Sequence, residues 1–413
     1  MRIACRQQNL DIKAPPSKSV YHRELIVNFI LGARGDYLNE SPEDNDDIRA
    51  TKACLRALEN NDSEEIILPC NESGSTLRFM IPVALACKSG SVKKLVFKTR
   101  GRLIDRPIEE LAECLAPFGV SITKDKEANE ITVTGNIEPG LYVIDGSVSS
   151  QYISGLLMAL SVFDGESAVE VTGGIASIHY IELTVAALAK YGINITREGD
   201  TFKVPAKTAI AVPDGKFEVE GDWSNGAFLL CLGSLIRGGS AKVSGLNMES
   251  VQGDREIMHF LKLAGITYLV EDNTIFVMDS RINPVRKILE MDCSDIPDIV
   301  PYMAVLGAFR AEKTTLKGIK RLRIKESDRA KAITEMLSAI GGNVTLEEDT
   351  ITIEYIDKIA DDIVLTSSGD HRMAMAAVLC AAATGREIEL DDINCLDKSF
   401  PEFRKVLEKE MLV

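Results

Sequence analysis

Four segments of the sequence repeat one local pattern at nearly constant spacing. Each holds the end of an amphipathic helix, a glycine, a β-branched strand, an acidic or Asn-containing turn and a second strand. The glycines are 73, 73 and 76 residues apart, at Gly119, Gly192, Gly265 and Gly341. Solenoid repeats are usually about 20 to 50 residues long. The longer period therefore predicts a compact unit of about two helices and four strands, used several times.

The alternative is chance recurrence of a common helix–hairpin motif, and the even spacing argues against it. A looser version of the pattern occurs in "CLRALENNDSEEIILP", which starts at residue 54. A chain of 413 residues with 45% hydrophobic content is long enough for two or three domains with large cores. We therefore expect an α/β protein built of repeated units that are grouped into two domains.

Charge and composition exclude several classes of function. The net charge of −15 argues against nucleic-acid or anionic-membrane partners, which need a basic face. One tryptophan and 6% aromatic residues leave few stacking platforms for bases. The longest apolar stretches run about 11 residues, short of the roughly 18 that span a bilayer, and the N-terminus has no apolar signal segment.

Cysteine and histidine usage points to a cytoplasmic protein without a metal site. The nine cysteines are scattered, odd in number and contain no C-x-x-C pair, which is typical of reduced, mostly buried thiols. The four histidines are not spaced as metal ligands.

The stretch "KAPPSKSVYHR" at residues 13–23 places cations where a helix is about to start. Two prolines hold the backbone extended, and Ser17 or Ser19 is a good N-cap for the apolar-periodic segment that follows. Free backbone N–H groups and the helix dipole then favour an anion, and Lys18 and Arg23 add full charges. An ordinary capped helix with surface cations is the competing interpretation.

Other stretches place cations or Ser/Thr/Gly clusters beside the start of apolar helices. They include "NESGSTLRF", "DIPDIVP", "KESDR" and "GDHRMAM". Each alone is typical of a loop, a cap or a solvated helix face. Together they bring eight cations to helix starts or turns in an acidic chain, which indicates a pocket for a polyanionic substrate. The eight are Lys18, Arg23, Arg78, Arg106, Lys325, Arg329, Arg372 and Lys398.

Two carboxylates are candidates for proton chemistry in such a pocket. Asp298 lies among apolar residues at the mouth of a buried helix, where it is either the N-cap or a base. Glu326 lies beside Lys325 and three residues before Arg329, and such neighbours would tune a carboxylate for acid–base work. No Ser-His-Asp set, P-loop or G-x-G-x-x-G motif is present.

These motifs, in this order, resemble the 5-enolpyruvylshikimate-3-phosphate synthase family, the 3-phosphoshikimate 1-carboxyvinyltransferases. The resemblance runs over residues 13 to about 403 and is carried by "PSKS…R", "SSQ", "KESDR", "DHRMAM" and "KSFPEF" in combination. It implies two similar domains, each of three βαβαββ repeats, arranged as an inside-out α/β barrel. The implied division is residues 1–15 plus 222–413 for the first domain and 16–221 for the second, with the active site in the cleft between them.

The resemblance also implies a reaction. The 5-hydroxyl of shikimate 3-phosphate adds to C2 of phosphoenolpyruvate while C3 is protonated, and the tetrahedral intermediate then loses phosphate and a proton. This step belongs to the shikimate pathway, which leads to chorismate and the aromatic amino acids. No metal or organic cofactor is implied, and the expected partners are the two substrates of a monomeric protein, with no nucleic acid and no membrane.

Site residues follow from the same resemblance, position by position. Candidates for proton transfer are Lys18, Asp298 and Glu326. Shikimate 3-phosphate would be bound by Ser19, Arg23, Ser149, Ser150, Gln151, Ser177, Tyr180, Asp298 and Lys325. Phosphoenolpyruvate would be bound by Lys18, Gly74, Arg106, Gln151, Arg329, Arg372 and Lys398.

Two positions depart from the family pattern and are assigned no role. Glu72 stands where the family often has Asn, and Arg321 stands where some members place an Asn on the shikimate ring. Two alternatives stay open: the sister enzyme that acts on UDP-N-acetylglucosamine, and a non-catalytic member that binds a phosphate ligand. The sister enzyme typically has Lys-Asn at positions 18–19 and a reactive Cys near "KTRGRLIDRP", which contains none.

Overall fold

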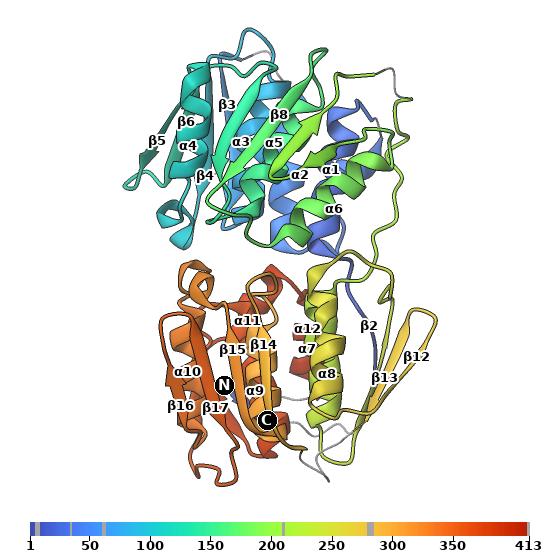
Figure 1. Cartoon of the computed structure of the whole chain (residues 1–413), viewed down its shortest axis with the longest axis vertical. Helices are drawn as coiled ribbons and strands as arrows, with labels where there is room; N and C mark the ends of the chain where they lie inside the picture. Colours follow the sequence, from blue (N-terminus) through green and yellow to red (C-terminus); the bar gives the residue numbers. More distant parts are fainter. Residues whose placement is uncertain (5–8, 34, 60–62, 209–210, 279–284, 411–413) are drawn as a thin grey trace. The chain divides into compact units, whose positions relative to one another are not determined.

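The computed structural model of the chain describes residues 1–4, 9–33, 35–59, 63–208, 211–278 and 285–410. It divides into two compact units (Figure 1). The first unit is Met1–Ser17 with Glu220–Val413, and the second unit is Lys18–Val219. Each boundary lies two residues from the one expected from the sequence.

Four four-stranded sheets share one strand order, two in each unit. In each sheet the first two strands are parallel, and an antiparallel hairpin of the last two joins the second strand. The second unit contains β3 (Glu65–Asn71), β4 (Lys94–Thr99), β6 (Glu130–Thr134) and β5 (Ser121–Asp125), and then β7 (Leu141–Asp145), β8 (Ser167–Thr172), β10 (Thr201–Val204) and β9 (Thr196–Glu198). The first unit contains β2 (Asn9–Lys13), β11 (Ser240–Ser244), β13 (Thr274–Met278) and β12 (Tyr268–Glu271), and then β14 (Val285–Asp292), β15 (Ala311–Lys317), β17 (Thr350–Glu354) and β16 (Val344–Leu346).

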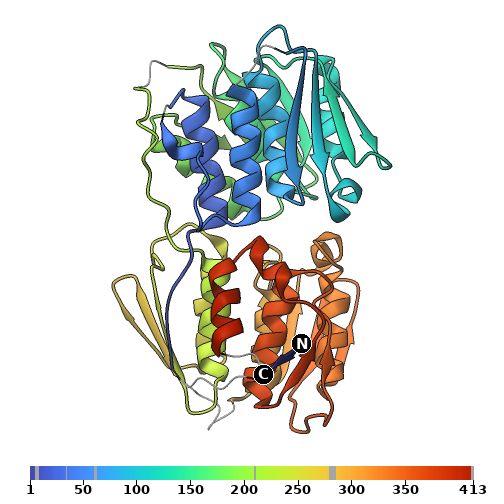
Figure 2. The same ribbon diagram turned by 180° about the vertical axis from the view of Figure 1, so that it is seen from behind.

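Two helices complete each of these four repeats. They are α3 (Gly74–Cys87) with α4 (Glu109–Leu115), α5 (Ser150–Leu160) with α6 (Ile178–Ala189), α7 (Trp223–Leu235) with α8 (Ile257–Leu263), and α9 (Val300–Arg310) with α10 (Arg329–Ala339). The order strand, helix, strand, helix, strand, strand is the predicted βαβαββ unit. Strand β2 lies near the N-terminus, far in sequence from the other strands of its sheet, and it pairs in parallel with β11 (Figure 2).

The predicted helix–glycine–hairpin pattern is confirmed at all four sites. The four glycines have φ of 76°, 85°, 67° and 103°, at Gly119, Gly192, Gly265 and Gly341. This left-handed conformation ends a helix at little cost for a residue without a β carbon. A two-strand hairpin follows each of them.

The remaining elements form shorter third parts. In the first unit they are β1 (Arg2–Ile3), β18 (Val364–Leu365), α11 (His371–Thr384), β19 (Ile388–Leu390) and α12 (Pro401–Glu410), and in the second unit α1 (Lys18–Ile30) and α2 (Asp46–Glu59). The looser segment from residue 54 departs from the pattern, since α2 leads into β3, which pairs in parallel with β4. Short 3-10 helices are η1 (Asp36–Leu38), η2 (Gly101–Asp105), η3 (Ala116–Phe118), η4 (Gly253–Glu256), η5 (Lys320–Ile324) and η6 (Asn394–Lys398).

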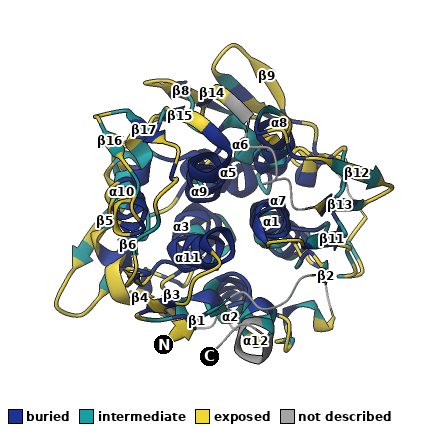
Figure 3. Cartoon of the chain, turned by 90° about the horizontal axis from the view of Figure 1, so that it is seen from below, coloured by how far each residue is buried: buried dark blue, intermediate teal, exposed yellow. Residues whose placement is uncertain are grey.

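Buried helices form the interior of the first unit. Every residue of α7, α9 and α11 is buried, and these three helices pack on one another (Figure 3). A helix that is apolar all round must be surrounded by protein, and the sheets supply that cover. The α/β fold class and the inside-out arrangement are thereby confirmed. The eight cysteines within the described ranges are free thiols, and six of them are buried.

Candidate active site

Lys18 is the first residue of α1 and is held by a carboxylate. Its Nζ lies 2.8 Å from Oδ2 of Asp47, in the first turn of α2. The Lys18 side chain keeps 16% of its surface exposed. The predicted helix is therefore present: it begins at Lys18, so Ser17 is the residue directly before it, whereas Ser19 lies inside α1. The Ser17 hydroxyl donates to Gln252 Oε1 at 2.9 Å.

Arg23 ties α1 to α6, another helix of the second unit. Its guanidinium donates to Ser19 O at 2.6 Å, to Thr184 Oγ1 at 2.7 Å and to Tyr180 O at 2.7 Å. Burial lowers the pKa of Arg23 to about 9. The structure thus brings together Ser19, Arg23 and Tyr180, which were predicted as ligands of one substrate.

The "SSQ" motif lies at the start of α5. Ser149 is the N-cap and accepts a hydrogen bond from Gln151 N at 3.3 Å. The Gln151 side chain donates to Ser75 Oγ at 2.8 Å and accepts from Arg78 Nη1 at 2.9 Å. Gln151 therefore joins the N-terminus of α5, with Ser150 beside it, to the N-terminus of α3.

Ser177 precedes α6 in a conformation that non-glycine residues rarely adopt. Its φ is 54°, in the left-handed region, and its side chain is buried. Such strain is retained only where the surrounding structure holds it. Tyr180 N donates to Ser177 O at 3.1 Å, which keeps these two predicted residues together.

Gly74 leaves room for two guanidinium groups at the start of α3. A β carbon at this position would overlap Nη1 of Arg106 and would lie 3.2 Å from Nη1 of Arg78. Arg106 itself follows η2, with α4 beginning three residues later, at Glu109. The backbone N–H groups of a helix start and two cations therefore meet at one point, as an anion site requires.

Glu72, which departs from the family pattern, lies against the start of η2. A β carbon on Gly101 would lie 2.7 Å from its Oε1, and the residue is exposed.

In the first unit, Asp298 is held by cations. Its Oδ1 lies 2.8 Å from Nη1 of Arg329 and 3.4 Å from Nζ of Lys325. Burial alone would raise the pKa of Asp298, but Lys325, Arg329 and Arg372 together hold it well below its usual range. The interpretation of Asp298 as an N-cap is wrong: the N-cap of α9 is Ile299, because the carboxylate turns to the cations.

Arg329 organises three carboxylates. It binds Asp370 through Nε at 2.7 Å and Nη2 at 3.2 Å, and Glu326 through Nη2 at 2.9 Å, besides Asp298. Lys398 adds a second cation, with Nζ 3.9 Å from Glu326 Oε1. The predicted residues Asp298, Glu326, Arg329 and Lys398 therefore form one network.

Arg372 joins the same network through Asp370. Asp370 is the N-cap of α11 and accepts from Arg372 N at 2.9 Å. The Arg372 guanidinium donates from Nη1 to the Tyr302 hydroxyl at 3.0 Å. Burial alone would lower the pKa of Arg372, but Tyr302, Asp298 and the other neighbouring acids raise it, so it stays charged.

Lys325 belongs to the same network and has a lowered pKa. Burial lowers its pKa to about 8; the charge of Asp298 opposes that shift, and Arg321 and Arg329 add to it. Arg321, the second departure from the family pattern, thus acts on a predicted substrate ligand.

Sequence reasoning missed several acidic groups of these two clusters. Asp47 and Asp370 hold Lys18 and Arg329, and their partners are distant in the sequence. Asp254 is a buried carboxyl bonded to Ser224, and burial, together with the charge of Asp298, raises its pKa to about 7. An isolated acid in "VQGDREI" gives no sequence signal for such an environment.

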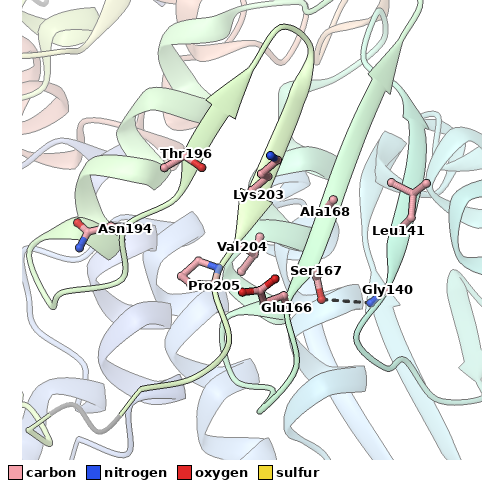
Figure 4. Close-up of a pocket in the computed structure, with 10 residues that line it drawn as sticks. All are labelled: Gly140, Leu141, Glu166, Ser167, Ala168, Asn194, Thr196, Lys203, Val204 and Pro205. Atoms are coloured by element: carbon pink, nitrogen blue, oxygen red, sulfur yellow. Dashed lines mark hydrogen bonds between the residues drawn. The ribbon is translucent and has the colours of Figure 1, made fainter.

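A groove of about 520 Å³ in the second unit contains none of the predicted residues (Figure 4). Glu166 and Lys203 are its charged lining residues, and it lies beside the ends of β7, β8 and β10. Within the described ranges, no group of three or more His, Cys, Asp or Glu side chains could hold a metal ion. Over the same ranges, no helix is long and apolar enough to cross a membrane.

Comparison with solved structures defines the class of protein. The chain is similar to an EPSP synthase from Acinetobacter baumannii, with a TM-score of 0.74 and 20% identity over 100% of this chain and 98% of the other. It is also similar to the enolpyruvyl transferase NikO from Streptomyces tendae, with a TM-score of 0.69 and 13% identity over 99% and 96%. The fold is that of the enolpyruvyl transferases.

Sequence comparison narrows this class to one family. The family model described as EPSP synthase (3-phosphoshikimate 1-carboxyvinyltransferase) matches residues 5–407. Proteins named 3-phosphoshikimate 1-carboxyvinyltransferase from Clostridioides difficile (strain 630) and Clostridium novyi (strain NT) are 30% and 32% identical, over 96% and 99% of this chain and 93% and 97% of theirs. The chain belongs to the EPSP synthase family, which confirms the resemblance read from its motifs.

Proposed function

We propose that this chain transfers the enolpyruvyl group of phosphoenolpyruvate to the 5-hydroxyl of shikimate 3-phosphate and releases phosphate. Membership of the family supports the reaction. The observation that carries the mechanism is the network in which one guanidinium, that of Arg329, holds both candidate acid–base residues, Asp298 and Glu326. A shared cation keeps both carboxylates ionised and oriented until a substrate proton reaches one of them.

The chemistry needs one base and one acid. Asp298 would accept the proton of the 5-hydroxyl as the hydroxyl oxygen bonds to C2 of phosphoenolpyruvate. That proton would pass to the phosphate group as the bond between C2 and the phosphate oxygen breaks. Lys18 and Glu326 are the candidates for delivering a proton to C3 and removing one from it in the elimination step. Lys18 can donate because its ammonium is only partly covered and lies against Asp47.

The second unit would supply ligands for both substrates. Ser19, Arg23 and Tyr180 would contact shikimate 3-phosphate, together with Ser149, Ser150, Gln151 and Ser177. Arg106 and the α3 N-terminus at Gly74 would bind phosphoenolpyruvate, with Gln151 between the two groups. Guanidinium groups and helix N-termini suit phosphate and carboxylate oxygens, which supports this assignment.

The first unit would complete both sites. Lys325 and Asp298 would contact the ring hydroxyls of shikimate 3-phosphate, and Arg329, Arg372 and Lys398 would bind phosphoenolpyruvate. Most donors of Arg329 are already used by carboxylates, so its role would be to hold Asp298 and Glu326 as much as to touch the substrate. We propose that the protein is monomeric and cytoplasmic.

The test is phosphate release by the purified protein with phosphoenolpyruvate and shikimate 3-phosphate, without added metal. A parallel reaction offers UDP-N-acetylglucosamine as the acceptor. Release with the first pair alone, with a product that carries one added enolpyruvyl group by mass, is the expected result. Release with UDP-N-acetylglucosamine alone would overturn the acceptor, and release with neither by a folded protein would favour a non-catalytic ligand-binding role.

A further inference from the structure

The chain passes twice between the two units, and the two passing segments are paired inside the first unit. These segments, residues 15–17 and 220–222, are called the crossing pair below. Pro16 and Gly221 form an antiparallel β-bridge. Two backbone hydrogen bonds flank it, from Ser17 N to Glu220 O at 2.7 Å and from Asp222 N to Pro15 O at 2.8 Å.

Gln252 uses its whole side-chain amide on the crossing pair and the helix that follows it. Its Oε1 accepts from Ser17 Oγ at 2.9 Å and from Trp223 N at 3.1 Å. Its Nε2 donates to Glu220 Oε1 at 2.8 Å and to Gly221 O at 2.9 Å. The residue is buried, and two donors and two acceptor sites are all that an amide has.

Other residues of the segment 245–252 also form hydrogen bonds with the crossing pair. The Glu220 carboxylate accepts from Ser250 Oγ at 2.6 Å and from Asn247 Nδ2 at 3.1 Å. Gly221 N donates to Gly245 O at 3.0 Å, and a β carbon at 221 would overlap that same carbonyl. The segment 245–252 therefore grips the crossing pair through both side chains and backbone.

We propose that Gln252 is a positioning residue for enolpyruvyl transfer. It fastens Ser17, the residue before Lys18, to the start of α7. Because α1 begins at Lys18, this fastening fixes the position at which α1 starts and therefore the position of Lys18. The reason is entropic. A single crossing segment has free backbone torsions, each of which costs free energy to fix. Hydrogen bonds to a buried amide fix them in advance, so less of the substrate binding energy is spent on ordering Lys18.

This inference rests on the proposed function for its kinetic consequence, but the fastening can be measured without activity. In Gln252→Ala, hydrogen exchange at the amides of Ser17 and Asp222 is expected to become about tenfold faster or more, because these are the amides of the crossing pair. Glu249→Gln, an exposed neighbour in the same segment, is the matched control and is expected to leave both amides unchanged. Ile275→Val, in the same core, controls for a general loss of stability.

The only tryptophan of the chain is a second reporter. Trp223 is fully buried, its backbone N donates to Gln252, and its indole Nε1 donates to Asn247 O at 2.9 Å. Its fluorescence therefore reports the surroundings of the fastening. Gln252→Ala is expected to shift the emission to longer wavelength, and Glu249→Gln is not.

The kinetic arm measures turnover and the two KM values for shikimate 3-phosphate and phosphoenolpyruvate. A misplacement of Lys18 is expected to lower the kcat of Gln252→Ala by about ten- to a hundredfold, with a smaller change in either KM. Gln252→Glu offers a rescue. A glutamate at position 252 can donate to Glu220 only when it is protonated. The kcat of Gln252→Glu relative to wild type is therefore expected to rise as the pH falls.

Each result of these experiments either supports or contradicts the positioning role of Gln252. Unchanged exchange at Ser17 and Asp222 in folded Gln252→Ala would show that Gln252 does not fasten the crossing pair. Faster exchange with unchanged kcat would show that the fastening does not position Lys18. If Gln252→Ala does not fold, Ser17→Ala removes the hydrogen bond from Ser17 to Gln252 and is judged by the same two criteria. A wild-type protein without enolpyruvyl transfer would overturn the proposed function, while the exchange experiment would still decide whether Gln252 fastens the crossing pair.

Discussion

Arg329 and Asp370 form a bidentate ion pair, at 2.7 and 3.2 Å, in which the two side chains are 1% and 0% exposed. Asp370 also accepts from Ser327 Oγ and from Arg372 N. One buried carboxylate thus holds both arginines that are expected to bind phosphoenolpyruvate in the first unit.

Asp370→Asn should therefore damage both stability and binding. Removing one partner of a buried ion pair leaves the other charge uncompensated, at a cost of about 3–5 kcal/mol in the free energy of unfolding. We expect the affinity for phosphoenolpyruvate to fall as well, measured at a temperature where the variant is folded. Asp357→Asn, which changes an exposed carboxylate of the same unit, is the control. Stability equal to that of wild type would contradict the assigned importance of the pair.

Lys18→Ala should abolish most turnover. A positioned acid or base is typically worth about 10²- to 10⁴-fold in rate, and the ammonium lost here is the one held by Asp47. Steady-state phosphate release is the measurement, and Lys13→Ala, an exposed lysine five residues earlier, is the matched control. Near-native kcat in Lys18→Ala would remove this residue from the mechanism.

Gly74→Ala should weaken phosphoenolpyruvate binding more than it changes stability. The new β carbon meets the Arg106 guanidinium, the far end of a flexible side chain, which can swing away from the anion site. We expect KM for phosphoenolpyruvate to rise about tenfold, equivalent to about 1.4 kcal/mol, with a nearly unchanged melting temperature. Gly90→Ala is a fair comparison, because a β carbon there meets nothing within 4 Å. An unchanged KM would mean that Arg106 does not touch this substrate.

The pH dependence of kcat/KM should show the ionisation of Lys325. Its pKa is lowered to about 8, so a step that needs the ammonium form should lose rate as the pH rises through that value. Arg321 is one of the charges that lower this pKa, so Arg321→Gln should raise it and move the alkaline limb of the kcat/KM profile to higher pH. A limb that stays in place would show that Lys325 is not the group that titrates.

Asp254 should make the protein less stable at high pH. Its folded pKa of about 7 exceeds the ordinary value of about 3.9, so between these values the folded state binds a proton that the unfolded state has lost. Stability from this group therefore falls as the pH rises from about 4 to about 7, by an amount on the order of 2–4 kcal/mol.

Asp254→Asn removes that titration and should reduce the loss of stability between pH 5 and pH 8. Denaturant unfolding at the two pH values measures it, with Asp357→Asn as the exposed counterpart. An equal loss in wild type and Asp254→Asn would rule out a buried ionisation at this position.

Local signals in the sequence were sufficient for the repeats. A glycine that ends a helix and a hairpin that follows it involve residues close in the chain, so Gly119 and its three counterparts could be recognised before any packing was known. The caps formed by Ser149 and Asp370 could be predicted for the same reason. Some of the predicted ligands contact one another within a unit, as Arg23 and Tyr180 do in the second and Arg329 and Asp298 do in the first.

The partners of those ligands were decided by tertiary structure alone. Arg329 meets Asp370 across 41 residues of sequence, and Ser17 meets Gln252 across 235. From the sequence, Asp298 could be either a helix cap or a base, and the cations that packing brings to it turn the carboxylate away from the helix end. The sequence determines the charge and length of each side chain. Which groups bury that side chain and pair with it depends on how the folded core packs.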